Sequence, residues 1–244
     1  MKVLDLFSGI GGFSLGLEWA GFETVAFCEY DEACKKVLDK HWPDVPKYTD
    51  VRELTAEQLN NDGIRDIGII TGGFPCQPYS RAGKRKASFD DRDMAPEFVR
   101  LVEDVKPAFA IGENVQGFVD VGLVPFLDDL EKVGYYTQAL SIPSCAVGLP
   151  SVERHIWTIS TPNEERCKRI SERAIQIITD MQGKFQGSDS RIPDRWNLPK
   201  ARVCGAGEGV AGRMDRLEQI GNSIPPQVVK VIGKAINLEL KPKP

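Results

Sequence analysis

The sequence is poor in the residues that build metal sites and disulfide frameworks. Its six cysteines are scattered with no C-x-x-C pair among them, and His41 and His155 are the only histidines in 244 residues. Closely spaced cysteines are the usual sign of zinc sites and of small disulfide-bonded domains. We therefore expect neither a metal site nor a disulfide framework.

Long apolar runs are also missing. No apolar stretch approaches the roughly 18 residues that a membrane-spanning helix needs. Met1 and Lys2 lead straight into the apolar VLDLF without a charged leader. We expect a cytoplasmic protein with no membrane partner.

Positive charge is not in excess over the chain as a whole. The formal net charge is -4 and the sequence pI is about 5.4, which argues against a protein that coats nucleic acid by bulk attraction. Basic residues are nevertheless segregated: four lie between Arg81 and Lys86, and residues 161–202 hold nine Lys/Arg against six Asp/Glu. Each stretch is compatible with a solvated surface loop or with a nucleic-acid contact.

Short β-branched runs alternate with helical patterns, which is typical of an α/β domain with a mainly parallel sheet. The 41% hydrophobic content is enough for one core. The predicted strands span residues 3–7, 24–29, 66–71, 108–114, 136–142 and 155–160, and amphipathic helices are predicted at 11–21, 31–41, 97–105 and 162–181.

The last helix is predicted to begin near Ser223, with Pro225 and Pro226 in its first turn, and to return to the main sheet. The segment between the sixth strand and this helix is polar and rich in Gly and Pro. We therefore predict a main domain of residues 1–160 plus 206–244 and a small separate region at 161–205.

A strand, a glycine turn and a helix follow one another in DLFSGIGGFSLGLEWAGF, where Gly9, Gly11 and Gly12 let the backbone approach a ligand. Glu29 ends the next strand, where a carboxylate can accept from both ribose hydroxyls. Tyr30 can stack on a nucleobase and Asp50 can accept from an adenine amino group. Helix caps and core packing are the structural alternatives. The pattern indicates an adenosine compound without separating S-adenosylmethionine from a dinucleotide.

The segment GGFPCQPYS holds a thiol in a stiff loop, because Pro75 and Pro78 fix the backbone on either side of Cys76. Glu113 and Asn114 end a neighbouring predicted strand, so they should lie at the same sheet edge. A carboxyl group in a buried setting tends to keep its proton and can donate it. A nucleophilic thiol beside such a group suits conjugate addition to an electron-poor ring.

These motifs together resemble those of the DNA (cytosine-5) methyltransferases. The glycine turn, FCEYD, TDV, GGFPCQPYS, ENV and RLEQIGNSIPPQV occur in that family's order and at comparable spacings. The resemblance implies an S-adenosylmethionine-dependent methyltransferase (Rossmann-like) fold, with 161–205 as target-recognition region. It also implies that Cys76 adds to C6 of a cytosine swung out of duplex DNA, while Glu113 holds N3 and C5 takes the methyl group.

The resemblance also assigns residues to roles. The implied catalytic residues are Cys76, Glu113, Asn114 and Arg154. The implied cofactor-binding residues are Phe7, Gly9, Gly11, Gly12, Glu29, Tyr30, Asp50, Val51, Pro75, Asn222 and Ser223. The implied DNA-binding residues are Gln77, Ser80, Arg81, Lys84 and Arg85 beside the thiol, with Arg191 and Arg195 in the recognition region.

One family element is altered, the Gln-x-Arg-x-Arg segment before the last strand. An ungapped alignment puts Ser151 at the glutamine position, and Glu153 and His155 at the two arginine positions. We expect Arg154 to supply the guanidinium near Glu113. This requires a local bulge, because neighbouring residues of a strand face opposite ways.

Three further interpretations use the same residues: a tRNA cytosine-5 methyltransferase, a DNA-binding homologue with weakened turnover, and a nicotinamide dehydrogenase. The last ranks lowest, because G-x-G-G and the Pro-Cys loop fit it poorly. The expected partners are S-adenosylmethionine as cofactor, double-stranded DNA and, in a restriction-modification pair, a cognate restriction endonuclease. The expected state is a monomer.

Overall fold

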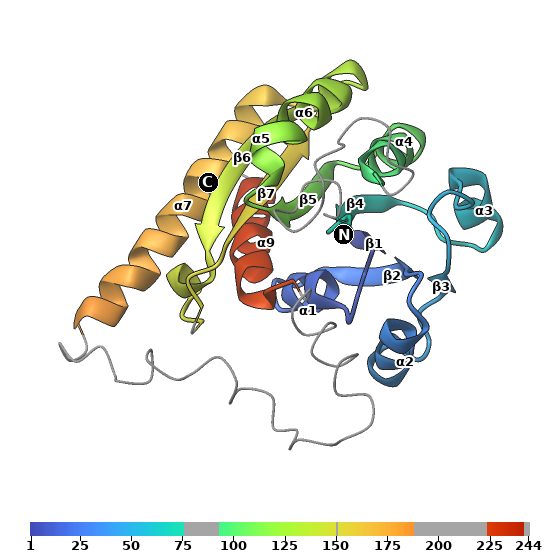
Figure 1. The fold of residues 1–244 in the computed structure, drawn as a ribbon, viewed down its shortest axis with the longest axis horizontal. Coiled ribbons are helices and arrows are strands. Elements are labelled where there is room, and N and C mark those ends of the chain that lie inside the picture. The colour runs from blue at the N-terminus through green and yellow to red at the C-terminus, as the bar shows by residue number, and fades with distance from the viewer. Residues whose placement is uncertain (76–92, 150, 188–223, 242–244) are drawn as a thin grey trace.

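The fold, seen in a computed structural model, is a seven-stranded sheet with helices on both faces (Figure 1). The structure describes residues 1–75, 93–149, 151–187 and 224–241. The strands are β1 (Lys2–Leu6), β2 (Glu23–Cys28), β3 (Lys47–Tyr48), β4 (Ile67–Gly72), β5 (Phe109–Val115), β6 (Tyr136–Pro143) and β7 (Arg154–Thr161). The predicted α/β class is confirmed, and each predicted strand is present within about two residues of its expected ends.

The sheet order is β3-β2-β1-β4-β5-β7-β6. All neighbouring pairs from β3 to β5 are parallel, whereas β7 runs antiparallel to both β5 and β6. The chain moves outward from β1 to β3, then returns to place β4 on the other side of β1. The strand order therefore reverses between β1 and β4. Sheets of this kind bind ligands in the crevice at the carboxyl ends of the strands where the order reverses.

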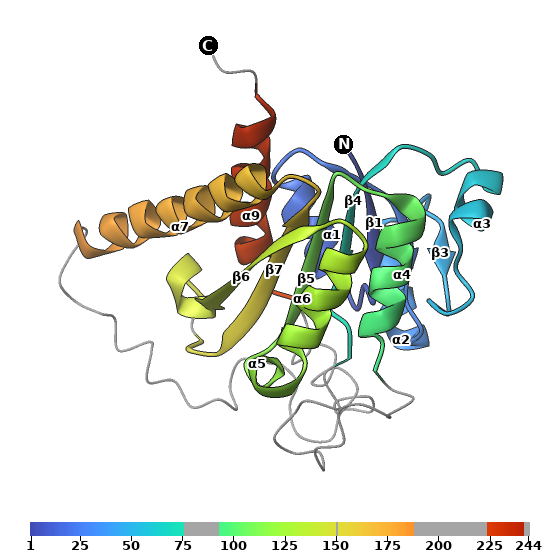
Figure 2. The same cartoon turned by 90° about the horizontal axis from the view of Figure 1, so that it is seen from above.

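Two helical layers cover the sheet (Figures 1 and 2). Helices α1 and α9 lie on one face, with α7 beside α9, and α4 and α6 lie on the other. The helices are α1 (Gly12–Glu18), α2 (Glu32–His41), α3 (Ala56–Asn61), α4 (Ala95–Val105), α5 (Phe118–Val121), α6 (Leu123–Lys132), α7 (Glu164–Gly187) and α9 (Pro226–Leu240), with a 3-10 turn η1 (Ser144–Val147). Helices α3, α5 and α6 were not expected from the sequence pattern.

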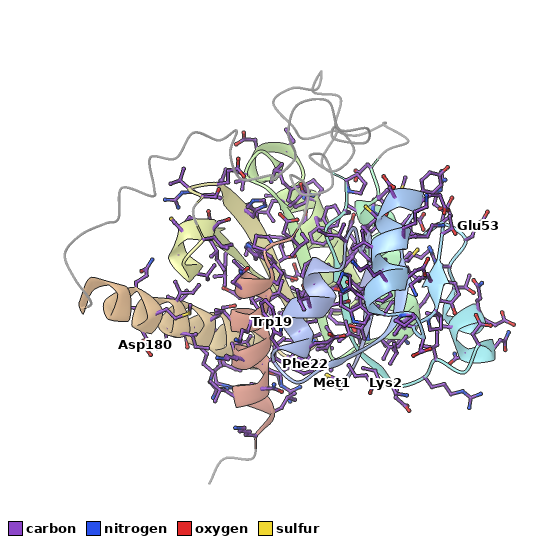
Figure 3. All side chains as sticks on the ribbon, turned by 90° about the horizontal axis from the view of Figure 1, so that it is seen from below. Met1, Lys2, Trp19, Phe22, Glu53 and Asp180 are labelled. Carbon is purple, nitrogen blue, oxygen red and sulfur yellow. The ribbon has the colours of Figure 1, made fainter. Side chains whose placement is uncertain are left out.

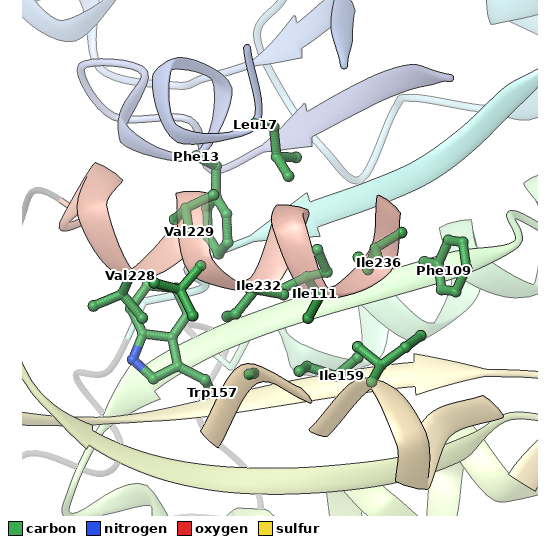
Figure 4. Packing of buried hydrophobic residues seen from close by; sticks show 14 of the residues in the cluster. Phe13, Leu17, Phe109, Ile111, Trp157, Ile159, Val228, Val229, Ile232 and Ile236 are labelled. Atoms are coloured by element: carbon green, nitrogen blue, oxygen red, sulfur yellow. The ribbon is translucent and has the colours of Figure 1, made fainter. Parts of the chain in front are cut away.

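The last helix is an internal layer rather than an appendage. Its apolar residues Val228, Val229, Ile232 and Ile236 pack between α1 and the strands β5 and β7 (Figure 4). Gly233 lets the two helices approach closely, since a Cβ there would lie 2.6 Å from the Cβ of Ala20. The expected return of this segment to the main sheet is therefore confirmed.

Polar contacts at the far end of α1 reinforce this packing. Lys230 places its ammonium 5.5 Å from the ring centroid of Trp19, a distance at which a cation is attracted to an indole face. Asn237 donates its side-chain amide to the carbonyl of Ala20. Trp19 and Phe22 both lie beside α9 (Figure 3).

Helix α7 shows that the predicted boundary at residue 161 does not coincide with an edge of the core. Ile170 and Ala174 belong to the same buried cluster as α9 and β7, and the buried Cys167 donates its thiol to the carbonyl of Ile159 on β7. Two arginines of α7 also hold Glu239 of α9, with Arg169 Nη2 at 2.6 Å and Arg173 Nη1 at 2.5 Å. The first part of the proposed recognition region is thus main-core helix, and the part from residue 188 onward lies outside the described residues.

Among the helices that the structure describes, none combines the length and apolarity required to cross a membrane. The 24-residue α7 is long enough, but charged residues recur along it.

Candidate active site at the carboxyl edge of the sheet

Four segments that are far apart in sequence converge at the carboxyl ends of the parallel strands. Close contacts link the turn after β1, the turn after β4, the end of β5 and Ile224, which lies two residues before α9. A Cβ added at Gly73 would lie 2.9 Å from Ile224 Cδ1 and 3.1 Å from Glu113 Oε2, and one added at Gly12 would lie 2.3 Å from the carbonyl oxygen of Ile224. Ligands of open α/β sheets bind at this edge, where the strand order reverses.

The three glycines of the first turn have different surroundings. A Cβ at Gly11 would lie 2.6 Å from the ring of Trp42, and Gly12 faces the backbone of Ile224, so both are required for packing. Gly9 has a φ of 53°, and none of the described residues places an atom within 4 Å of an added Cβ. Of the three, Gly9 therefore borders open space that a ligand can fill.

Glu29 links the glycine turn to the end of β2. One carboxylate oxygen accepts from the Gly9 amide at 2.6 Å and the other from the Asp31 amide at 2.7 Å. Burial raises the pKa of this carboxyl, while these two amide donors act in the opposite direction. A carboxylate offers about four acceptor positions, so acceptor capacity remains for a diol. The acceptor positions that Glu29 keeps free fit the hydroxyl groups of a nucleoside's ribose.

The other proposed cofactor residues around β3 divide into two kinds. Tyr30 is 71% exposed, so its ring is not core packing and is open to stacking. Val51 is buried with the α4 cluster. Asp50 is engaged by its neighbour, because Arg52 contacts both carboxylate oxygens through Nε and Nη2, and this contact lowers the pKa of Asp50. An adenine amino group would therefore meet a carboxylate that already holds a guanidinium.

Asp5 was not anticipated as a site residue, yet it is a buried carboxyl directly beneath the glycine turn. It accepts from the Ser14 hydroxyl at 2.7 Å and from the Thr71 hydroxyl at 2.8 Å. These contacts join β1 to the first turn of α1 and to β4. Complete burial raises the pKa of Asp5 to about 7 against the hydrogen bonds that lower it. Phe7, two residues further on, adopts a left-handed φ of 50°, a conformation that costs a non-glycine residue energy.

Glu113 and Asn114, adjacent on β5, point to opposite faces of the sheet. Asn114 donates its amide to the carbonyl of Phe74 at 3.3 Å, and so holds the segment that leads to Pro75. Glu113 faces the α9 side, with its Oε2 toward Gly73. The structure thus brings both predicted residues to the segment that precedes Cys76 in the chain.

His155, rather than Arg154, contacts Glu113. Its Nδ1 lies 2.6 Å from Glu113 Oε1, and the two side chains are 19% and 9% exposed. Glu113 is directly opposite Trp157, so His155 is its diagonal neighbour on the same face of the antiparallel pair. The ladder between β5 and β7 is unshifted from Ala110 to Val115. The expected bulge is therefore absent from this pair, and Arg154 is exposed on the opposite side of β7.

Several predicted site residues lie outside the described residues. They are Cys76, Gln77, Ser80, Arg81, Lys84, Arg85, Arg191, Arg195, Asn222 and Ser223. The described neighbours of two of these segments, Pro75 and Ile224, both belong to the converging edge. Within the described part of the chain, no group of three or more His, Cys, Asp or Glu side chains is arranged to hold a metal ion.

Comparison with known proteins identifies the family. The model of the C-5 cytosine-specific DNA methylase family matches residues 1–194. The chain belongs to this family. Type II methyltransferase M.NgoMIV of Neisseria gonorrhoeae is 27% identical over 217 residues, which cover 82% of this chain and 66% of that protein. Type II methyltransferase M.FnuDI of Fusobacterium nucleatum is 36% identical over 141 residues, which cover 55% of this chain and 39% of that protein.

A solved structure supports the same family relationship. A mutant of Spodoptera frugiperda DNMT2 superposes with a TM-score of 0.55 and 25% sequence identity, covering 66% of this chain and 50% of that one. The chain spans less than two thirds of the length of the two bacterial relatives, at 66% and 39%.

Two residues of the site carry a weak signal in the sequence. His155 occupies an arginine position of the altered element, and its pairing with Glu113 follows from the period of the strand once β5 and β7 are known to be neighbours. Ile224 is an apolar residue before a helix, a pattern too common to mark a site. Gly73 and Asp5 lie inside motifs that were recognised, but their contacts depend on segments distant in sequence.

Proposed function

We propose that the protein is an S-adenosylmethionine-dependent DNA (cytosine-5) methyltransferase. The observation that carries the proposal is the setting of Glu113: its Oε1 is bonded to His155 and its Oε2 is turned toward Gly73, three residues before Cys76 in the chain. The nucleoside-binding features of Gly9 and Glu29 lie at the same sheet edge. Family membership supports the reaction class.

The cofactor site of this proposal is built on Glu29, with the ribose on its carboxylate, the methionine part over Gly9, and the adenine near Tyr30 and Val51. Asn222 and Ser223 would close it, since Ile224, the next residue, contacts Gly12. When bound, S-adenosylmethionine supplies an electrophilic methyl group. Glu29 and the Gly9 amide orient it by being held to each other at 2.6 Å.

The chemistry assigned to the chain's own residues starts with the Cys76 thiolate. It forms a bond to C6 of the extruded cytosine, while Glu113 Oε2 donates a proton to N3, which takes up the negative charge that addition brings to the ring. C5 would then take the methyl group of the bound donor, which would be left as S-adenosylhomocysteine. Loss of the C5 proton to water restores the C5–C6 double bond and expels the thiolate, and N3 returns its proton to Glu113. Asn114 holds the Phe74 carbonyl and so restrains the loop that bears the thiol.

The proposed DNA contacts come from Gln77, Ser80, Arg81, Lys84 and Arg85, with Arg191 and Arg195 reading the sequence from the region that follows α7. Extruding the base costs a few kcal/mol of pairing and stacking, and the basic residues supply the attraction that offsets this cost. A monomer is sufficient for this scheme, and a cognate restriction endonuclease is the partner it would accompany.

The test is methyl transfer from a labelled donor to mixed-sequence duplex DNA. Wild-type protein should label DNA, and Cys76→Ala should not. Absence of label with wild type, or equal label with Cys76→Ala, contradicts the proposal. Duplex DNA carrying 5-fluorocytosine should form a denaturation-stable complex, because fluorine cannot leave as a proton does; binding without such a complex indicates a DNA-binding homologue. Preferential labelling of tRNA in competition indicates the RNA enzyme.

A further inference from the structure

The pair formed by His155 and Glu113 is unusual among the ion pairs of the described residues, because the proposed acid of the reaction is one of its members. The distance of 2.6 Å between Nδ1 and Oε1 is that of a strong, charge-assisted hydrogen bond. Both side chains are largely buried, at 19% and 9% exposure. Such a contact fixes the orientation of the carboxyl group and decides which of its oxygens remains available.

The available oxygen is Oε2. Because Oε1 is occupied by the imidazole, Oε2 is the atom turned toward Gly73 and the start of the thiol-bearing segment. Trp157 lies directly opposite Glu113 in the ladder and is fully buried, and Ile224 approaches the same glycine, Gly73, as Oε2 does. The carboxyl group has little freedom to exchange its two oxygens while the imidazole is in place.

We propose that His155 is a positioning residue of the methyl-transfer reaction, which donates Nδ1–H to Glu113 Oε1, presents Oε2 to the target base, and lets the pair carry the proton that the base receives. The inference rests on the proposed function. His155 stands at a position where the altered element would have an arginine. An imidazole can exchange a proton near neutral pH, whereas a guanidinium stays charged.

The proton count follows from the geometry. One proton sits on Nδ1 in the hydrogen bond to Oε1. With one further proton the pair is either an imidazolium, protonated also at Nε2, with a carboxylate, or a neutral imidazole with an acid protonated at Oε2. The two forms interconvert when Nε2 releases its proton to solvent and Oε2 takes one up. Only the second can donate from Oε2. Removing the further proton leaves a neutral imidazole, still donating from Nδ1, and a carboxylate, and that form has no proton to give to the base.

The charged surroundings favour the protonated pair. Among the described residues, the charges that act on the imidazole are Glu113 from β5 and Glu153 from the stretch before β7. Val115 and Ile142, its ladder partners on β5 and β6, are apolar. The hydrogen bond to Glu113 raises the pKa of His155, and the charges of Glu113 and Glu153 add to this against burial of the ring. The rate should therefore fall as pH rises through a value above the ordinary one for histidine, and be highest below it.

The kinetic test uses three proteins over pH 6 to 9 at saturating DNA and methyl donor. Wild type should lose rate on the alkaline side. His155→Arg holds Oε1 with a charge that does not titrate and that favours the ionised carboxylate, so its alkaline limb should lie at lower pH than that of wild type. His155→Gln should be slower by roughly tenfold or more at neutral pH, with an unchanged melting temperature as the check on folding. A His155→Gln protein that keeps the wild-type rate and pH profile overturns the proposal.

A second readout does not depend on activity. Because the chain has only two histidines, an imidazole NMR titration contains two signals, and His41→Asn assigns them without touching the site. The His155 signal should titrate above the ordinary value for histidine, and Glu113→Gln should move it down. A His155 titration unmoved by Glu113→Gln overturns the inference itself. An intact titration in a wild type that labels no DNA at any pH overturns the proposed function instead, and with it the role of the pair.

Discussion

Asn114 reaches from the end of β5 to the carbonyl of Phe74, 3.3 Å away, and thereby joins two neighbouring strand ends through a single side-chain amide. Its own oxygen accepts from the Val115 amide at 2.9 Å. Both partners of this side chain are backbone groups, so the contact sets the path of the chain rather than the position of one side chain.

Asn114→Ala should loosen the segment that leads to Cys76. The loss of a buried hydrogen bond leaves the Phe74 carbonyl without this donor and costs about 1 to 3 kcal/mol. We expect a lower melting temperature, with a loss of methyl-transfer rate larger than the loss of cofactor affinity. Asn114→Asp is the matched control, since it keeps the size and the oxygen but not the donor. Equal rates for wild type and the alanine variant would remove Asn114 from the machinery.

The buried carboxyl of Asp5 should make stability depend on pH. Its pKa in the fold is about 7, against an ordinary value near 3.9, so the folded chain holds a proton that the unfolded chain has released between these pH values. Stability contributed by this proton is present at low pH and lost as pH rises through 7, by up to about 4 kcal/mol.

Urea unfolding between pH 5.5 and 8.5 measures this dependence. Asp5→Asn keeps the shape of the side chain and cannot ionise, so its free energy of unfolding should vary less with pH than that of wild type. Other groups titrate in both proteins, and the difference between the two curves isolates Asp5. Parallel curves would show that Asp5 does not change its protonation on unfolding.

The glycine turn should separate packing from ligand binding. Gly12→Ala places a Cβ against the backbone carbonyl of Ile224, which cannot rotate away, and should lower stability by about 2 kcal/mol or more. Gly9→Ala meets no atom of residues 1–75, 93–149, 151–187 or 224–241, and its left-handed φ costs about 1 kcal/mol. Calorimetric titration with S-adenosylhomocysteine should show that Gly9→Ala loses more affinity, relative to its loss of stability, than Gly12→Ala does.

The arginine clamp on Glu239 should hold α7 against α9. Glu239 is 9% exposed and accepts from Arg169 and Arg173, which lowers the pKa of its carboxyl. Glu239→Gln should destabilise the fold by about 1 kcal/mol, because two partly exposed guanidinium groups keep their access to water. Glu165→Gln, at the exposed start of α7, is the control. The clamp's contribution should decrease as pH falls through the lowered pKa, so the difference in unfolding free energy between Glu239→Gln and wild type should be smaller at pH 3 than at pH 7.

Much of the fold follows from local pattern. Strands such as β4 and β5 are apolar runs bounded by turns, and α9 is marked by two prolines and an apolar stripe. Short helices such as α3 and α5 escape prediction, because four to six residues carry too little periodicity. The packing of α7 against α9 could not be predicted for another reason: α7 has an ordinary amphipathic pattern, and its local sequence does not show which element its apolar face meets.

The site divides in the same way. Gly9, Glu29 and Glu113 stand in motifs whose spacing identifies them. The expectation that Arg154 contacts Glu113 was wrong, because it rested on the charge of Arg154 and not on the direction in which residue 154 points from the strand. The alternation of β7 sends residue 155 to the face of Glu113 and residue 154 away from it. To predict which side chain faces Glu113, the strand that pairs with β5 must be known, and the sequence alone does not show that this strand is β7.

The position of Ile224 against Gly12 has a consequence for biosynthesis. A ribosome emits the first turn long before residue 224, so the nascent polypeptide carries an uncovered glycine turn and an uncovered sheet face until the segment from Ile224 through α9 has emerged. A translation product that stops before this segment would expose the apolar face of the sheet to chaperones.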